Sequence, residues 1–404
     1  MAYDVIVVGA RCAGAPAAML LARQGQRVLL VDKAAMPSDS LSTHYIQQRG
    51  VALLAKWGLL DRVRTTDCPP IRGVDFDFGP FVIKGDPPPA DGIADAFAPR
   101  RKVLDPLLQN AAVEAGVELR DATALDAVLW DGDRVCGVRL RGRGGAVTEE
   151  RCKLIIGADG HRSPVAEMVG AGAYQERPTY TCFYYSYFSG VPIERSEIYV
   201  RPRCVTISFP TNGGLALVLV VKPAAEFARF KTDIEAGFFE AVNTAPSLAE
   251  RLRAGRREER YSGTGDSPNF FRKPFGNGWA LIGDAGHHRD PCTAQGISDA
   301  FLSADLAAAA YGDVAAGRAA WEEAFGRYEG VRNQLAMPMY ELTCQRASFQ
   351  PPPPDAMALL AAVARNPEQM NRFAGVDAGT VTVQEFFSPA NIGAIMAGAH
   401  AGPA

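Results

Sequence analysis

The sequence lacks the features that mark several large classes of protein. It has no Lys/Arg-rich block, and its 42 Lys and Arg against 45 Asp and Glu give a formal net charge of −3, so nucleic acid is not expected as a partner. No uninterrupted apolar stretch reaches the length of a membrane span. With 48% hydrophobic and 22% charged residues, the composition also excludes a disordered, collagen-like or coiled-coil chain. We therefore expect a folded protein that acts on a small-molecule substrate.

Cysteine and histidine are present without the spacing that metal sites or disulfide frameworks use. The 8 cysteines form no Cys-x-x-Cys pair. His287 and His288 are adjacent but have no further carboxylate or cysteine partners nearby in the sequence, so no metal site is expected. The chain enters the apolar run Val5–Val8 almost at once, without the charged and apolar regions of a secretion signal. These observations predict a cytoplasmic protein with reduced thiols.

Residues 4–32 have the pattern of one βαβ unit. An apolar strand over 4–8 precedes the turn Gly9 to Gly14, a helix over 15–24 and a strand over 27–31. Asp32 then stands about 20 residues beyond the turn, where a dinucleotide fold places the acid that holds a ribose. Such a turn points backbone N–H groups at a pyrophosphate. Arg11 replaces the second glycine of Gly-x-Gly-x-x-Gly, so the backbone there is shifted or the Arg11 side chain points away, toward phosphate.

Two later segments repeat the arrangement of a strand followed by an acidic turn. The run 154–157 leads into Asp159-Gly160, which alone is only turn chemistry. The run 279–282 leads into Gly283-Asp284, then to Pro291 and a helix over 297–310. Backbone amides near Gln295 and Gly296, at the start of that helix, can stabilise negative charge, which suits a reduced flavin.

The three segments, in this order, resemble the FAD-binding signature of the FAD-dependent monooxygenases related to para-hydroxybenzoate hydroxylase. That superfamily also contains flavin halogenases and geranylgeranyl reductases. The resemblance implies an α/β fold: a Rossmann-like FAD-binding domain, an inserted, mainly antiparallel β-sheet substrate domain and a C-terminal helical segment. Two departures from the family pattern are Ala294, at a usual glycine of the flavin loop, and Ser298, at a usual asparagine. The cofactor-binding residues that the pattern and the resemblance imply are Gly9, Arg11, Cys12, Ala13, Gly14, Asp32, Lys33, Arg101, Asp159, Gly283, Asp284, Pro291, Ala294, Gln295, Gly296 and Ile297.

The FAD-binding domain is expected to be discontinuous. Its segments are residues 1–75, 98–174 and 265–340, and the substrate domain takes 76–97 and 175–264. Residues 341–404 would form a helical cap or a subunit interface, in a monomer or a homodimer. The strand candidates 181–188, 197–200, 205–209 and 215–221 should pair antiparallel.

Alternation along the first of these strands places Phe183, Tyr185 and Tyr187 on one face, and Cys182, Tyr184 and Ser186 on the other. One face could form the floor of a ligand cavity, or the aromatic residues could simply fill a core.

We expect a monooxygenase that uses FAD, NAD(P)H and O2. It would oxygenate an aromatic or polyketide-like substrate through a flavin hydroperoxide. No second Gly-x-Gly-x-x-Gly unit is present, so NAD(P)H should dock only transiently. His44 is the candidate catalytic residue, to orient or deprotonate a phenol, with a plain hydrogen-bonding role as the alternative. The substrate-binding candidates are Tyr45, Gln48, Tyr185, Tyr187 and Phe209.

Other functions are compatible with the same cofactor. A flavin-dependent reductase of carbon–carbon double bonds is favoured by Phe209 to Gly214, which resembles an aromatic-Pro-x-x-x-Gly stretch of geranylgeranyl reductases. A halogenase is disfavoured because the Trp-x-Trp-x-Ile-Pro segment of that group is missing. A non-catalytic flavin-binding protein is the remaining alternative. A monooxygenase would consume O2 with NAD(P)H and substrate, a reductase would work anaerobically, and a binding protein would do neither.

Overall fold

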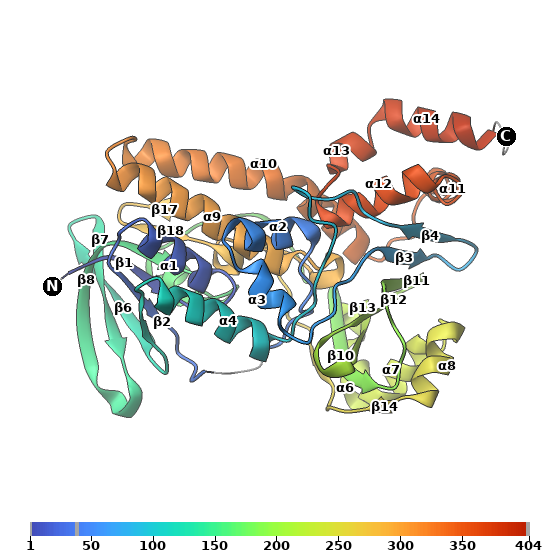
Figure 1. The fold of residues 1–404 in the computed structure, drawn as a ribbon, viewed down its shortest axis with the longest axis horizontal. Coiled ribbons are helices and arrows are strands. Elements are labelled where there is room, and N and C mark those ends of the chain that lie inside the picture. Colours follow the sequence, from blue (N-terminus) through green and yellow to red (C-terminus); the bar gives the residue numbers. More distant parts are fainter. Residues whose placement is uncertain (1, 37–39, 401–404) are drawn as a thin grey trace.

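A mainly parallel sheet forms one end of the molecule in the computed structural model, which describes residues 2–36 and 40–400 (Figure 1). Its strand order is β17-β18-β8-β1-β2-β5, and β1 is parallel to both β2 and β8. β1 and β2 are almost wholly apolar because both faces of the sheet are covered. The strands are β1 (Tyr3–Val8), β2 (Val28–Val31), β5 (Glu118–Arg120), β8 (Val147–Gly157), β17 (Phe275–Gly276) and β18 (Trp279–Leu281).

Helices cover one face of this sheet and an antiparallel hairpin extends from the other. The helical face buries a core that includes Met19, Leu54, Leu104 and Phe301. Its helices are α1 (Gly14–Arg23), α2 (Gln48–Lys56), α3 (Leu60–Arg64), α4 (Arg101–Glu114), α9 (Gly296–Ala315) and α10 (Trp321–Ala347). The opposite layer is built from β6 (Ala124–Asp131), β7 (Arg134–Arg141), the start of β8, η1 (Arg143–Gly145) and α5 (Pro164–Met168).

A second, mainly antiparallel sheet lies at the other end of the molecule (Figure 1). Its order is β14-β10-β13-β12-β11-β3-β4, with β15 also paired to β10. The expected antiparallel pairing is confirmed: Leu219 of β13 faces Tyr185 and Ile207. β3 joins β11 in parallel, a pairing that alternation alone does not indicate. The strands are β3 (Val74–Asp77), β4 (Val82–Gly85), β10 (Thr181–Ser189), β11 (Ser196–Arg201), β12 (Cys204–Pro210), β13 (Ala216–Pro223), β14 (Arg256–Arg257) and β15 (Ser262–Thr264).

The two faces of β10 enter different cores, as its alternation predicts. Cys182 and Tyr184 pack against helices on the outer face, whereas Phe183, Tyr185 and Tyr187 face inward with Tyr45 and Phe209. The outer layer consists of η3 (Ala224–Glu226), α6 (Phe227–Thr232), α7 (Ile234–Val242) and α8 (Pro246–Ala254). A small sheet of β9 (Ala173–Arg177), β16 (Asn269–Arg272) and β19 (His287–His288) completes the strands.

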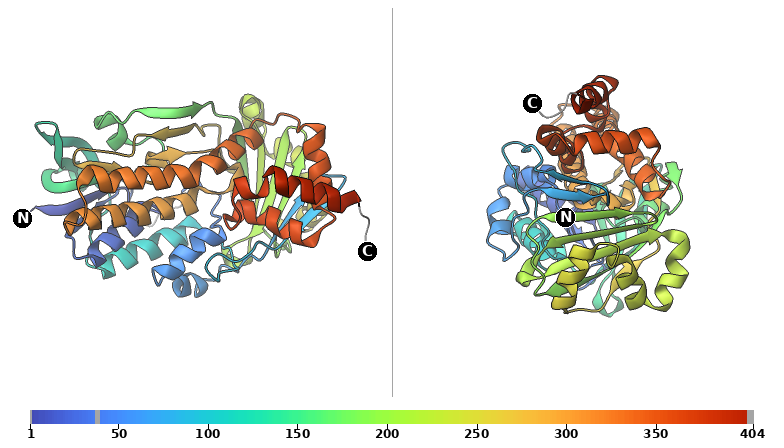
Figure 2. Two further views of the ribbon diagram at one scale, coloured as in Figure 1. Left: turned by 90° about the horizontal axis from the view of Figure 1, so that it is seen from above. Right: turned by 90° about the vertical axis from the view of Figure 1, so that its right-hand side faces the viewer.

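The C-terminal helices pack onto the second sheet beside the end of α10 (Figure 2). Phe373, Val376 and Phe386 share a core with Phe76 and Ile83 of β3 and β4. The helices are α11 (Pro354–Val363), α12 (Pro367–Ala378), α13 (Val383–Phe386) and α14 (Pro389–His400). The expected fold class is therefore confirmed. In the described part of the chain, no helix is long and apolar enough to cross a membrane.

Candidate cofactor and substrate site

The turn between β1 and α1 has the geometry of a phosphate-binding loop. Gly9 has φ +104°, and a Cβ there would overlap the Ala158 carbonyl oxygen; one at Gly14 would overlap the Gly9 carbonyl oxygen. Only glycine fits both positions. The first turn of α1 has no acidic residue and no side-chain cap, so the positive end of this helix is left to attract an anion. Arg11, in the position of the missing glycine, is partly buried, and its carbonyl accepts the Ala15 N–H at 2.9 Å.

Asp32 is fixed beside this turn at the end of β2. Its carboxylate accepts the N–H of Ala10 at 2.8 Å and the N–H of Ala34 at 2.9 Å, and the residue is buried. A carboxylate has about four acceptor sites, so positions remain for the hydroxyls of a ribose. Lys33, the next residue, is exposed.

Arg101 lies in the first turn of α4, with its guanidinium directed at the same region. It binds Asp105 through two hydrogen bonds of 2.8 and 3.0 Å, and Asp105 is fully buried. The Cys12 thiol donates to the same carboxylate at 3.6 Å, and burial raises the pKa of this thiol to about 12. Sequence analysis missed Asp105, although its i,i+4 spacing from Arg101 on a helix was a usable signal.

The two other acids of the pattern have different surroundings. Asp284 lies in η4 (Gly283–Ala285), where Gly283 has φ +55° and donates its N–H to Ser303 Oγ at 2.8 Å. Within residues 2–36 and 40–400, the Asp284 side chain makes no hydrogen bond and is partly exposed. Asp159, in contrast, accepts from the Ser163 hydroxyl and from the Val165 N–H at 3.0 Å, at the start of α5. The Asp159 carboxylate is therefore engaged within the chain, and that of Asp284 is available to a ligand.

The expected flavin loop runs from η5 (Pro291–Thr293) into α9. Ala294 has φ +51°, a left-handed conformation that explains why glycine is usual there. Gln295 donates from Nε2 to the carbonyl oxygens of Thr293 at 3.0 Å and Asp377 at 2.7 Å, which ties the loop to α12. A Cβ at Gly296 would meet nothing within 4 Å, so open space lies at this helix start, and the next residue, Ile297, is buried. This space, the uncapped α1 and the available Asp284 fit FAD.

A cavity of about 490 Å³, partly open to solvent, lies against the flavin loop. Three of the expected substrate residues line it, namely Tyr45, Gln48 and Phe209, together with Cys292, Thr293 and Ala294. The Tyr45 and Phe209 rings meet edge to face, with centroids 5.3 Å apart. The other wall residues include Phe76, Ile198 and Ile207. Tyr185 and Tyr187 do not line this cavity; they lie on the same sheet face, around His44.

His44 is fully buried and has φ +61°. Its Nε2 is hydrogen-bonded to the Tyr187 hydroxyl, and the two rings are stacked with centroids 5.9 Å apart. The Arg100 guanidinium lies 4.0 Å from the centre of the Tyr187 ring and binds Glu259 at 2.5 and 3.0 Å. Sequence analysis missed Arg100 and Glu259, because 159 positions separate them in the chain and no local pattern connects them.

The glycine turn, the acid after β2 and the open helix start beside a second acid together define a protein that binds a dinucleotide of the FAD type. Residues 2–342 match the family of FAD binding domains, and the chain therefore belongs to this family of FAD-dependent oxidoreductases. Among the described residues, no group of three or more His, Cys, Asp or Glu side chains could hold a metal ion.

Curated relatives and solved structures of similar proteins come from several branches of the superfamily. The digeranylgeranylglycerophospholipid reductase of Methanosarcina mazei is 28% identical over 331 residues, which is 78% of this chain and 76% of that protein. In structure, the chain is similar to the myxobacterial chondrochloren halogenase CndH, with a TM-score of 0.81, 22% identity and coverage of 100% and 98%. PqsL, a probable FAD-dependent monooxygenase from Pseudomonas aeruginosa, gives a TM-score of 0.71, 22% identity and coverage of 93% and 99%. These structural similarities establish the fold alone.

Proposed function

We propose that the protein is an NAD(P)H-using monooxygenase that oxygenates a small aromatic or polyketide-like substrate. The observation that carries this proposal is the aromatic cavity beside the flavin loop. Apolar and aromatic side chains form most of its walls and a few polar groups lie among them, which is the usual lining of a small-molecule site. Tyr45, Phe76 and Phe209 provide apolar rings on its walls, which suit a flat, aromatic ligand. When bound, FAD would supply the redox chemistry, with NAD(P)H as reductant and O2 as oxidant.

The residues of the chain would bind the cofactor and exclude water. Asp32 is placed to accept the ribose hydroxyls, and Asp284 to accept hydrogen bonds nearer the flavin. The N–H groups at the start of α9, from Gly296 onward, favour negative charge at the open space next to them. The inward face of the second sheet closes the far side of the cavity with apolar side chains, so water would be displaced when a substrate enters.

We further propose a positioning role for His44. Its Nε2 and the Tyr187 hydroxyl share a hydrogen bond, so the pair can hold a proton next to Tyr45, which lines the cavity. Arg100, held by Glu259, also packs on the Tyr187 ring. His44 does not itself line the cavity, and this favours orientation of the wall over direct contact with the substrate.

A reductase of carbon–carbon double bonds is the second candidate. It is favoured by the similarity to reductases of digeranylgeranylglycerophospholipid and by Phe209, which begins the Phe209 to Gly214 segment and lines the cavity. The two functions differ in their use of oxygen. A monooxygenase adds one oxygen atom to its substrate, whereas a reductase adds two hydrogen atoms to its substrate and works without O2.

The test is a substrate screen on the purified protein with its flavin identified by absorbance and mass. Aromatic and polyketide-like compounds are incubated with NADH or NADPH, in air and anaerobically, and the product mass is measured. We expect O2 uptake and a product with one more oxygen atom. An anaerobic product with two more hydrogens would establish the reductase instead.

A matched pair of variants links the activity to the cavity. Phe209→Leu alters the cavity wall and should raise KM for the substrate. Phe188→Leu changes an equally buried side chain on the outer face of β10 and should leave KM unchanged. Equal effects of the two variants would show that the substrate binds elsewhere.

A further inference from the structure

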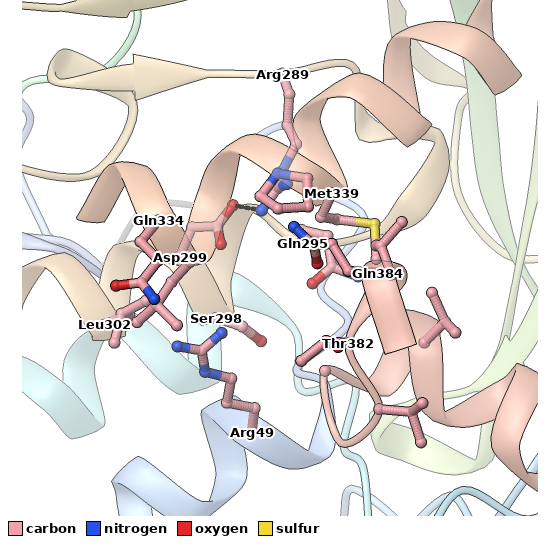
Figure 3. Close-up of a pocket in the computed structure, with 16 residues that line it drawn as sticks. Arg49, Arg289, Gln295, Ser298, Asp299, Leu302, Gln334, Met339, Thr382 and Gln384 are labelled. Atoms are coloured by element: carbon pink, nitrogen blue, oxygen red, sulfur yellow. Dashed lines mark hydrogen bonds and ion pairs between the residues drawn. The ribbon is translucent and has the colours of Figure 1, made fainter. Parts of the chain in front are cut away.

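A second pocket lies near the flavin loop, and the proposed reaction does not use it. It has a volume of about 660 Å³, is partly open to solvent, and lies between α2, α9, α10 and the connection from α12 to α13 (Figure 3). Arg49 extends into it from α2, and Arg289 and Asp299 lie at its opposite side (Figure 3). Its walls combine these charged groups with neutral amides and apolar side chains.

The negative charge of Asp299, the acid that lines this pocket, is already balanced by a neighbouring positive charge. Asp299 forms an ion pair with Arg289 and lies 3.5 Å from Nε2 of His287. Burial alone would raise the pKa of Asp299, but Arg289 and His287 outweigh burial and hold this pKa below its ordinary value. Asp299 is therefore ionised, and the charge of Arg289 balances it. Arg49 is left as the excess positive charge.

Within residues 2–36 and 40–400, Asp299 attracts the Arg49 guanidinium only through space and does not bind it directly. The guanidinium forms no hydrogen bond and no ion pair there, although the side chain is partly buried and burial lowers the pKa of Arg49. Its stem lies alongside Gly379, where an added Cβ would be 3.3 Å from Arg49 Cδ. A guanidinium presents five N–H donors in a planar fork that matches a carboxylate. An anion in this pocket would satisfy donors that no side chain of the described chain satisfies.

The rest of the lining indicates what kind of anion fits. The amides of Gln334 and Gln384 make no hydrogen bond among the described residues, so both can bind a polar head group. Around them the walls are apolar, from Leu302, Leu335, Pro338, Met339, Val381 and Val383. An inorganic anion would leave these walls uncovered, whereas an organic acid would cover them with its apolar body.

We propose that this pocket is a binding site for a small carboxylic acid with an apolar body, and that Arg49 binds the carboxylate through two parallel hydrogen bonds. Gln295 also lines the pocket, and its side chain connects the flavin loop to Asp377, a residue of the substrate cavity. An occupant of the second pocket therefore contacts the residue that joins the two sites. Its binding should change the absorbance of the bound flavin.

The experiment is calorimetric titration of the flavin-loaded protein with benzoate and with octanoate, without NAD(P)H. We expect at least one of these acids to bind in a 1:1 ratio. Arg49→Gln should weaken that binding at least tenfold, and Arg49→Lys, which keeps the charge but loses the fork, should weaken it less. Benzamide and sulfate, which lack the charge and the apolar body respectively, should bind at least tenfold more weakly.

Two controls separate this site from the substrate cavity and from unfolding. Ile207→Trp fills the substrate cavity and should leave the binding of the acids unchanged. The circular dichroism spectrum and the flavin content of Arg49→Gln should match those of the wild type. Failure of both acids to bind, undiminished binding in Arg49→Gln, or loss of binding in Ile207→Trp would each overturn the proposal.

Discussion

Two glycines of the cofactor site differ in what a methyl group would meet. At Gly14 a Cβ would overlap the Gly9 carbonyl oxygen, so Gly14→Ala should impair folding itself. At Gly296 the space is open. Gly296 is the first residue of α9, so we predict that Gly296→Ala changes the stability of the flavin-free protein by less than about 0.5 kcal/mol, yet weakens FAD binding at least tenfold. Urea unfolding and flavin fluorescence titration measure the two effects. Unchanged FAD affinity would show that the cofactor lies elsewhere.

The two acids of the site differ in what their removal disturbs. Asp284 makes no hydrogen bond within residues 2–36 and 40–400, so Asp284→Ala should change the stability of the flavin-free protein by less than about 0.5 kcal/mol. It should weaken FAD retention at least tenfold. Asp32→Ala leaves the Ala10 N–H without its acceptor and should cost about 1–3 kcal/mol even without FAD. Flavin content after gel filtration measures FAD retention in the two variants, and urea unfolding measures the stability of the flavin-free proteins. Full flavin occupancy in Asp284→Ala would contradict the assignment.

His287 should make the folded state sensitive to mild acid. It is fully buried against Phe271, with ring centroids 5.2 Å apart, and burial lowers its pKa from 6.5. As the pH falls below 6.5, the unfolded chain takes up a proton that the folded chain does not. Stability should then fall by up to about 1.4 kcal/mol per pH unit. Asp299, whose pKa is lowered from 3.8, loses its contribution only at still lower pH.

We therefore predict that His287→Phe has a shallower dependence of unfolding free energy on pH between 7 and 5. Urea unfolding at several pH values measures it. Some slope should remain, because burial also lowers the pKa of His161. An unchanged slope in the variant would show that His287 can be protonated in the folded state.

At the scale of elements, the flavin loop carries a local conflict between sequence and backbone. Ala294 occupies a left-handed conformation, which costs roughly 1–2 kcal/mol for a residue with a Cβ. Ala294→Gly removes this cost but makes the unfolded chain more flexible, so we predict a net change within about 1 kcal/mol. Ala294→Val should lower the free energy of unfolding by more than about 1 kcal/mol, because β-branched residues tolerate positive φ worst. Thermal unfolding of both variants tests this prediction. Equal melting temperatures for the two variants would show that the backbone at Ala294 is not strained.

Helices and strands in which apolar residues recur regularly could be predicted from the sequence. Pairings between strands far apart in the chain could not. The βαβ unit and the alternation of β10 follow from short-range rules. The helix expected over 297–310 exists but extends from Gly296 to Ala315, because element ends depend on packing. The parallel pairing of β3 with β11 connects segments over 100 residues apart. The same distance hides the contact of Arg100 with Glu259.

The same limit applies to the site. The proposed cofactor-binding residues lie in short motifs that the backbone conformation demands, such as Gly9 and Gly14. The cavity instead depends on which strand faces reach the flavin loop. Alternation identified the aromatic face of β10, but only the structure shows that Tyr45 and Phe209 reach the cavity while Tyr187 packs on His44.

In the whole molecule, the C-terminal helices connect both pockets to the flavin loop. Ala374 and Asp377 of α12 line the proposed substrate cavity, and Val376 lines the second pocket. The Asp377 carbonyl accepts from Gln295, and its carboxylate binds Arg346 of α10 at 2.7 and 2.9 Å. The position of α12 and the conformation of the flavin loop are thus linked through one residue.

This link predicts that a change in α10, outside both pockets, affects the cofactor. Arg346→Gln leaves the buried Asp377 without its ion partner. Because Arg346 itself is only partly buried, we expect a loss of about 1–2 kcal/mol, between the values for exposed and fully buried pairs. FAD dissociation should also become faster, because Gln295 loses a fixed acceptor. Arg327, on the same helix, forms more exposed ion pairs with Glu323 and with Asp313 of α9; Arg327→Gln is the matched control and should change neither quantity by much. Stopped-flow measurement of flavin release, together with urea unfolding, tests this. If Arg346→Gln lowers stability but leaves the release rate at the Arg327→Gln value, the C-terminal helices stabilise the fold without acting on the flavin loop.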